Sequence, residues 1–110
     1  MKTYDILMTA DAADDLTELR DYIAKVLCAP EAARAYLQRL RSEIASLKEM
    51  PARCMLVSDE PWHTRGIRRL LVKNSFIYYR IDESAKKVYI LNIIYDRRDQ
   101  LAALSRMDNE

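Results

Sequence analysis

The sequence predicts an α+β domain in which a two-helix N-terminal hairpin packs on a four-stranded, mainly antiparallel sheet. Apolar residues recur at steps of three and four between residues 12 and 47, which indicates amphipathic helices. Three segments after residue 66 are rich in β-branched and aromatic residues, which favour strands. The length of 110 residues, of which 50% are hydrophobic and 32% charged, is typical of one globular domain. We therefore expect residues 1–104 to form this domain and residues 105–110 to form a polar tail.

The first half of the chain predicts a strand followed by two helices. Residues 4–9 suit a strand, and Thr9 or Asp11 can accept a hydrogen bond from the free N–H groups at the start of the first helix. Pro30 suits the first turn of the second helix, because its missing N–H leaves no donor unsatisfied there. Helices this close in sequence should form an antiparallel hairpin with one shared apolar surface. Its members are Ala12, Leu16, Leu19, Ile23, Val26 and Leu27 in the first helix and Ala33, Leu37, Leu40, Ile44 and Leu47 in the second.

The second half of the chain predicts a loop and then an antiparallel meander. The loop runs from residue 51 to 66, includes a short strand at residues 55–57, and carries Trp62 as a packing residue and His63 at the surface. Hairpin-length connections link the three strands that follow, and a short helical turn comes after them. The strands are residues 67–72, 76–81 and 88–95, and the turn is Gln100–Leu104.

The face of the sheet turned away from the helices is a candidate binding surface. Phe76, Tyr78 and Arg80 alternate onto one face of the middle strand. The helical hairpin covers only one face, and the chain is too short to supply another layer. An aromatic and cationic face then predicts a partner, unless the loop at residues 51–64 and the C-terminal segment fold over it. The last strand is apolar on both faces, with Val88, Ile90 and Ile94 opposite Tyr89, Leu91, Ile93 and Tyr95.

Basic charge is concentrated in the second half of the chain. Residues 1–49 carry seven Lys or Arg and nine Asp or Glu, whereas residues 62–98 carry nine Lys or Arg and three Asp or Glu. This asymmetry predicts an anionic partner, either nucleic acid or an acidic protein segment. The alternative is that these cations only keep the surface soluble.

Composition excludes several classes of protein. The single glycine, Gly66, excludes glycine-rich phosphate loops, and the single histidine, His63, excludes a multi-histidine metal site within one chain. No apolar run approaches the ~20 residues that span a bilayer, and no secretion signal is visible. We read Cys28 and Cys54 as reduced thiols. We therefore expect a cytoplasmic protein with no metal, no small-molecule cofactor and no membrane partner.

Five segments in a fixed order carry a resemblance to a known family. They are residues 9–16 and 30–33 at the starts of the helices, 66–70 and 76–82 in the sheet, and 93–99 at its end. Together they resemble the RelE/ParE toxins of bacterial type II toxin-antitoxin systems, a family that includes plasmid stabilization proteins. The likeness spans about residues 1–104.

The resemblance implies a growth-inhibiting toxin that a co-expressed antitoxin neutralises by wrapping around it. ParE-like members poison DNA gyrase, whereas RelE-like members cleave messenger RNA on the ribosome without a metal ion. A third possibility is a non-toxic protein-interaction domain with the same fold. Whether the chain is an enzyme depends on which of these is true.

The same resemblance supplies candidate site residues. A metal-independent nuclease needs cations for the phosphate and a group that transfers protons. The candidates for that role are Arg69, Arg80, Tyr95, Arg97 and Arg98, with Tyr78 or His63 as further proton-transfer groups. The candidates for contacts with a partner or target are Arg68, Lys73, Phe76, Tyr78, Arg80, Arg97 and Arg98.

Two departures from the RelE-like pattern favour a ParE-like gyrase inhibitor. Phe76 falls near the position where RelE-like enzymes place an arginine, and Gln100–Leu104 contains neither tyrosine nor histidine. Tyr95 precedes the Arg97–Arg98 pair instead of following it. The sequence therefore favours inhibition of gyrase over cleavage of RNA.

Overall fold

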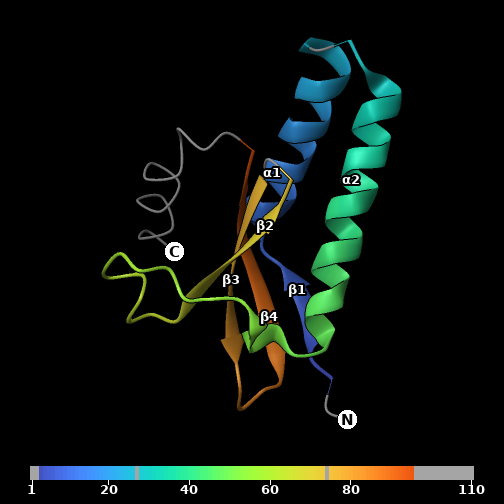
Figure 1. Cartoon of the computed structure of the whole chain (residues 1–110). Helices are drawn as coiled ribbons and strands as arrows, with labels where there is room; N and C mark the ends of the chain where they lie inside the picture. The colour runs from blue at the N-terminus through green and yellow to red at the C-terminus, as the bar shows by residue number, and fades with distance from the viewer. Residues whose placement is uncertain (1–2, 27, 74, 96–110) are drawn as a thin grey trace.

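The computed structural model describes residues 3–26, 28–73 and 75–95. Two helices and four strands occur in the predicted order, and the helices form a hairpin beside the sheet (Figure 1). The α+β class is therefore confirmed. The elements are β1 (Asp5–Met8), α1 (Ala10–Asp21), α2 (Pro30–Ala45), β2 (Ile67–Val72), β3 (Ser75–Asp82) and β4 (Lys87–Ile94).

The four strands form one mixed sheet in the order β1-β4-β3-β2. The pairs β2–β3 and β3–β4 are antiparallel, as the predicted meander requires, and β1 lies parallel to β4. The first and last strands are thus neighbours, so the helical hairpin is the crossover that joins β1 to the rest of the sheet. The predicted helical turn Gln100–Leu104 and the polar tail lie outside the described residues.

Local side-chain chemistry sets where the helices begin. The Thr9 hydroxyl accepts a hydrogen bond from the Ala12 N–H at 3.2 Å and donates to the Ile90 carbonyl at 2.8 Å, so it both caps α1 and attaches it to β4. Pro30 occupies the first turn of α2 as predicted. The first helix is shorter than predicted, because residues 22–26 form a π-helical turn.

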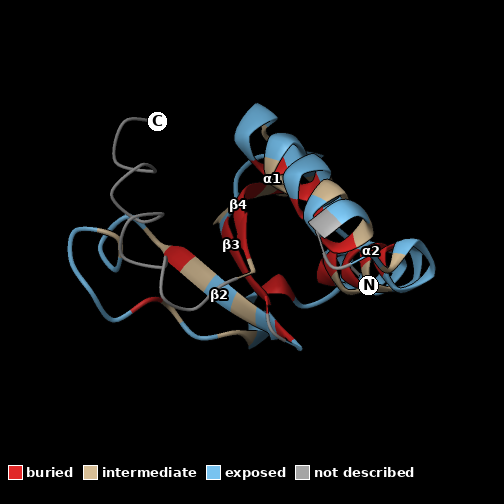
Figure 2. Cartoon of the chain, turned by 90° about the horizontal axis from the view of Figure 1, so that it is seen from above, coloured by how far each residue is buried: buried red, intermediate tan, exposed pale blue. Residues whose placement is uncertain are grey.

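The apolar stripes of both helices pack against one face of the sheet, which we call the helix-facing face. Figure 2 shows both helices on one side of the sheet, with buried residues turned toward the strands and exposed residues outward. Ile77 and Tyr79 of β3 and Ile90 of β4 are fully buried in this core. The helix positions predicted from the spacing are buried wherever the structure describes their side chains: Ala12, Leu16, Leu19, Ile23, Ala33, Leu37, Leu40, Ile44 and Leu47. Among the described residues, no helix is long and apolar enough to cross a membrane.

The opposite face of the sheet, which we call the distal face, carries a second and smaller core. The loop between α2 and β2 swings to this side (Figures 1 and 2). Val57 donates its N–H to the Ile67 carbonyl at 2.8 Å, and a single antiparallel bridge at Leu56 confirms the short strand predicted there. Trp62 packs as predicted against the buried cluster, whose members are Val57, Ile67, Phe76, Tyr78, Leu91 and Ile94.

A bulge in β4 changes the predicted alternation of that strand. Tyr78 pairs with Asn92 whereas Tyr79 pairs with Ile90, so one residue of β4 has no counterpart in β3. Beyond the bulge Ile93 lies in the helix-facing core and Ile94 in the distal cluster, the reverse of the prediction. The Asp15 carboxylate holds the bulge from α1, accepting hydrogen bonds from the Ile93 N–H at 2.9 Å and the Asn92 amide at 3.2 Å.

Candidate functional site

Two arginines on the distal face lie over aromatic rings. Arg69 projects from β2 with its guanidinium carbon 4.6 Å from the centre of the Phe76 ring. Arg80 projects from β3 with its guanidinium carbon 4.3 Å from the centre of the Tyr89 ring. Both arginines are exposed, so each ring orients a cation without hiding it from a partner. The structure thus brings together two of the predicted cations on one surface.

Phe76 and Tyr78 need correction as contact residues. The Phe76 residue is 9% exposed and Tyr78 is 0% exposed, because the loop from α2 packs over them together with their neighbours on the sheet. Burial raises the pKa of the Tyr78 hydroxyl, and the nearby Arg69 guanidinium opposes that rise. Within the described residues no hydrogen bond of ordinary geometry reaches this hydroxyl, and Arg69 is the cation that interacts with it. Tyr78 is therefore a core residue and is poorly placed to exchange protons with a substrate.

Arg68 also needs correction. It lies on the helix-facing side of β2, where its guanidinium donates to the Cys54 carbonyl at 2.6 Å and to the Ala52 carbonyl at 3.3 Å. Its charge thus satisfies two carbonyls in and just after the 3-10 turn Pro51–Arg53 instead of facing a partner. Lys73, another predicted contact residue, is exposed at the β2–β3 turn, where its backbone is in a left-handed conformation with φ of 52°.

Tyr95 lies on the other side of the sheet from Arg69 and Arg80. Its ring is 5.8 Å from the Tyr36 ring and 6.0 Å from the Tyr22 ring, both contributed by the helical hairpin. The structure therefore does not bring the candidate Tyr95 together with the candidates Arg69 and Arg80 on one surface. Arg97 and Arg98 lie outside the described residues.

His63 is exposed on the loop, as predicted. One nitrogen of its ring, Nδ1, lies 3.0 Å from the Val57 carbonyl, which fixes the orientation of the imidazole. This contact joins two parts of the loop six residues apart and gives His63 a structural role. No cluster of three or more His, Cys, Asp and Glu side chains suited to a metal occurs in the part of the chain that the structure describes.

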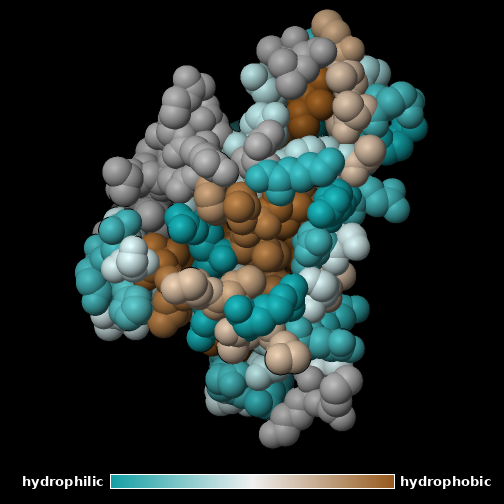
Figure 3. All heavy atoms as spheres, viewed as in Figure 1, coloured by the Kyte–Doolittle hydropathy of each residue, from teal (hydrophilic) through white to brown (hydrophobic). Residues whose placement is uncertain are grey.

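Two accessible members of the distal face were not predicted as contact residues from the sequence. Leu71 of β2 is 50% exposed, and Tyr89 of β4 is half-buried beneath Arg80. Leu71 lies two residues after Arg69 in β2 and therefore on the same face, so the alternation of side chains along the strand could have predicted it. Figure 3 views the molecule from the side of β2, between the helices and the loop, and hydrophobic side chains gather near the middle of that side with hydrophilic ones around them.

A helical hairpin on one face of a mixed four-stranded sheet, with exposed cations on the opposite face, is the architecture of the small toxins of the RelE/ParE type, and comparison with known proteins supports this class. The family model described as the ParE toxin of the type II toxin-antitoxin system parDE matches residues 6–100. The chain therefore belongs to the ParE toxin family. No curated protein matches its sequence.

Solved structures share this fold. The chain is similar to a protein of the chromosomal ParDE system of P. aeruginosa, with a TM-score of 0.71 and 23% identity, over 88% of this chain and 100% of that one. A protein of the RelBE2 toxin-antitoxin complex of Mycobacterium tuberculosis gives a TM-score of 0.60 and 23% identity, over 84% and 98% of the two chains. A double mutant of the E. coli toxin RelE in the free state gives a TM-score of 0.62 and 11% identity, over 94% of this chain and 97% of that one.

Proposed function

We propose that this member of the ParE toxin family inhibits DNA gyrase and is neutralised in the cytoplasm by a cognate antitoxin. The observation that carries the proposal is the match of the ParE family model to residues 6–100, nearly the whole domain. Gyrase is the target that the resemblance to ParE-like toxins implies. The antitoxin is proposed because the similar P. aeruginosa and M. tuberculosis structures come from toxin-antitoxin systems.

The geometry of the distal face favours binding over catalysis. Arg69 and Arg80 are exposed cations, but the tyrosine between them in the sheet, Tyr78, is buried with a raised pKa. Tyr95 packs among helix residues on the opposite face. General acid-base catalysis needs a proton-transfer group within hydrogen-bond reach of the reacting atom, and neither tyrosine meets that need beside these arginines.

The same face suits a protein partner with acidic and apolar side chains. Two exposed guanidiniums offer ion pairs, and Leu71 with the half-buried Tyr89 offers apolar area between and beside them. Arginine and aromatic side chains dominate the energy of protein interfaces. We assign the distal face as the surface where the antitoxin and the target compete.

Controlled expression of the chain in a bacterial host tests the proposal. We expect growth arrest with a DNA-damage response, and we expect the purified protein to stop supercoiling by gyrase in vitro. Arg80→Glu should relieve both effects, because it reverses the charge of a distal-face cation. Arg39→Glu is the matched control, since Arg39 is an exposed arginine on α2, paired with Glu43 and far from that face. Harmless expression of the folded protein would refute the toxin proposal and leave a protein-interaction domain.

Cleavage of messenger RNA is the second candidate, and the stacked arginines favour it. Guanidiniums over aromatic rings form a surface that can pair with phosphates and stack on unpaired bases. Growth arrest with new cleavage ends in translated messages, and without prior DNA damage, would replace gyrase by RNA as the target. Loss of those ends in Arg69→Ala would then place the arginine at the scissile phosphate.

A further inference from the structure

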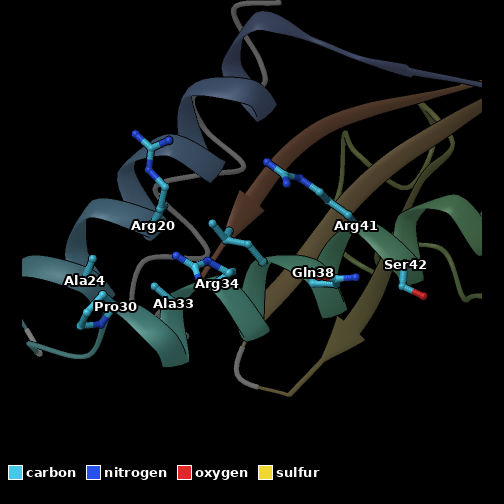
Figure 4. A pocket seen from close by; sticks show the side chains of 9 residues that line it. Arg20, Ala24, Pro30, Ala33, Arg34, Gln38, Arg41 and Ser42 are labelled. Carbon is cyan, nitrogen blue, oxygen red and sulfur yellow. The ribbon is translucent and has the colours of Figure 1, made fainter.

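A pocket opens between α1 and α2, on the helical hairpin and away from the distal face. Arg20 lines it from α1, and Arg34 and Arg41 line it from α2 (Figure 4). Its volume is about 760 Å³. The remaining lining residues are Ala24, Pro30, Ala33, Leu37, Gln38 and Ser42.

The cations around this pocket have weak partners within the chain. The Arg34 guanidinium lies 3.5 Å from the Glu31 carboxylate, with side chains 76% and 86% exposed. Arg20 lies 3.3 Å from the adjacent Asp21 carboxylate, again in an exposed pair. Exposed pairs of this kind contribute about 0–1 kcal/mol, so they exchange readily for ion pairs with a ligand. Arg41 makes no ion pair with any described residue.

The floor of the pocket is apolar and made largely of small side chains. Ala33 and Leu37 are buried members of the helix-facing core whose surfaces form part of the lining. Ala24 and Pro30 continue the apolar lining toward the end of the hairpin, where hydrophobic side chains lie between the two helices in the space-filling view (Figure 3). An apolar floor leaves a bare phosphate without hydrogen-bond donors below it, but it accepts an apolar side chain.

The lining residues on α2 follow one stripe along the helix. They run from Pro30 to Ser42 at alternating steps of three residues and one residue, which covers more than three helical turns, or roughly 18 Å. A groove of that length between two helices matches the apolar face of a helix of about twelve residues. Cations spaced along it match carboxylates at the borders of that face.

We propose that the groove between α1 and α2 binds an acidic amphipathic helix of a partner protein. Leucine-sized side chains of the partner contact Ala33 and Leu37, while its carboxylates pair with Arg20, Arg34 and Arg41. This surface is separate from the distal face, so one partner can occupy the hairpin while another occupies the sheet. The inference goes beyond the proposed function and does not depend on gyrase being the target.

A displayed library of helical peptides tests the proposal with the full-length chain. The library fixes leucines along one helical face and randomises the flanking positions among Glu, Gln and Lys, over a length of about twelve to fourteen residues set by the groove. We expect the selected peptides to be enriched in Glu. Their dissociation constants should rise about ten-fold or more for Arg41→Glu, because a paired charge becomes a repelling one. Gln38→Trp should also block them, since it fills the groove without changing charge.

Two matched variants separate this groove from other basic surfaces. Arg39→Glu reverses a charge on the same helix outside the pocket, and Arg80→Glu reverses one on the distal face. Both should leave peptide affinity within about two-fold of the parent chain, since neither residue reaches the groove. Circular dichroism confirms that each variant is folded.

Four results would overturn the inference. They are a selected pool without enrichment in Glu, no selected pool at all, affinity unchanged in Arg41→Glu, and affinity lost in Arg80→Glu alone. A short DNA duplex serves as the competing probe. If it binds more tightly than the selected peptides and depends on Arg41, the groove is a nucleic-acid site instead of a protein site.

Discussion

The two faces of the sheet are built from alternate residues of the same strands, yet they differ in nearly every property. The helix-facing face is closed by nine buried helix and turn residues, and most of the β3 and β4 side chains on it are apolar. The distal face has a smaller buried cluster, closed by one loop, and exposes Arg69 and Arg80 beside it. Stability is thus concentrated on one side of the sheet, and the surface available for recognition lies on the other.

Two adjacent tyrosines show how sharply the faces differ. Tyr78 and Tyr79 are both fully buried. The Tyr79 hydroxyl donates to the Pro51 carbonyl at 2.6 Å, which anchors the start of the loop beneath α2. The Tyr78 hydroxyl has no such partner among the described residues. The two tyrosines therefore differ in how their buried hydroxyls are satisfied within the described part of the chain: that of Tyr79 on the helix-facing side is bonded, and that of Tyr78 on the distal side is not.

The largest effect should come from truncating the helix-facing core. Ile90→Ala removes a side chain that is 0% exposed and leaves a cavity beneath the helices. We expect the free energy of unfolding, measured with urea, to fall by about 2–5 kcal/mol. Leu71→Ala on the distal face removes a half-exposed side chain and should cost less than about 1 kcal/mol. Equal losses at the two positions would contradict the division of stability between the faces.

A milder variant allows the same comparison if Ile90→Ala does not fold. Ile90→Val deletes one methyl group and should lower the free energy of unfolding by about 0.5–1.5 kcal/mol. A loss of this size in Ile90→Val would be assigned to the helix-facing core in the same way, because the valine is buried by the same helix residues.

The next effect should come from removing one hydroxyl from each tyrosine in turn. Tyr79→Phe leaves the Pro51 carbonyl without its donor, so we expect the free energy of unfolding to fall by about 1–2 kcal/mol. Tyr78→Phe removes a buried hydroxyl that lacks a partner among the described residues, so we expect no loss or a small gain of stability. The two urea midpoints therefore move apart. A loss of the same size in Tyr78→Phe would show that its hydroxyl is bonded in solution.

Much of the fold could be predicted from the sequence because its signals are local and periodic. The spacing of apolar residues gave the buried faces of both helices, and Pro30 marked the start of α2. The bulge in β4 could not be predicted, since it depends on Asp15 reaching from α1 to the Ile93 N–H across the fold. For the same reason the sides taken by Ile93 and Ile94 were reversed.

The candidate site was harder to predict because it depends on tertiary contacts. Arg80 was placed correctly on the face of Phe76 and Tyr78 by the strand period alone. The burial of Tyr78 follows from a loop with no periodic pattern, and the position of Tyr95 follows from the shifted register beyond the bulge. Neither fact leaves a signal in the surrounding residues. The pocket on the hairpin was also missed, because the helix stripes predicted only core.

The smallest effect should come from acid, and it should appear first on the distal side. The Glu60 carboxylate accepts hydrogen bonds from the Thr64 N–H and the Thr64 hydroxyl, which hold its pKa below the ordinary value of 4.5. Because the folded pKa is lowered, this contribution is fully present above that ordinary value and is lost as the pH falls through the lowered one. Trp62, the single tryptophan, lies in the same loop and reports on it by fluorescence. We expect its emission to shift to longer wavelength in acid before the helices unfold, and we expect Glu60→Gln, which cannot be protonated there, to remove this early step. If Trp62 emission and helix content change together in both chains, the loop and the helix-facing core unfold as one unit, and the distal face is not the weaker side of the sheet.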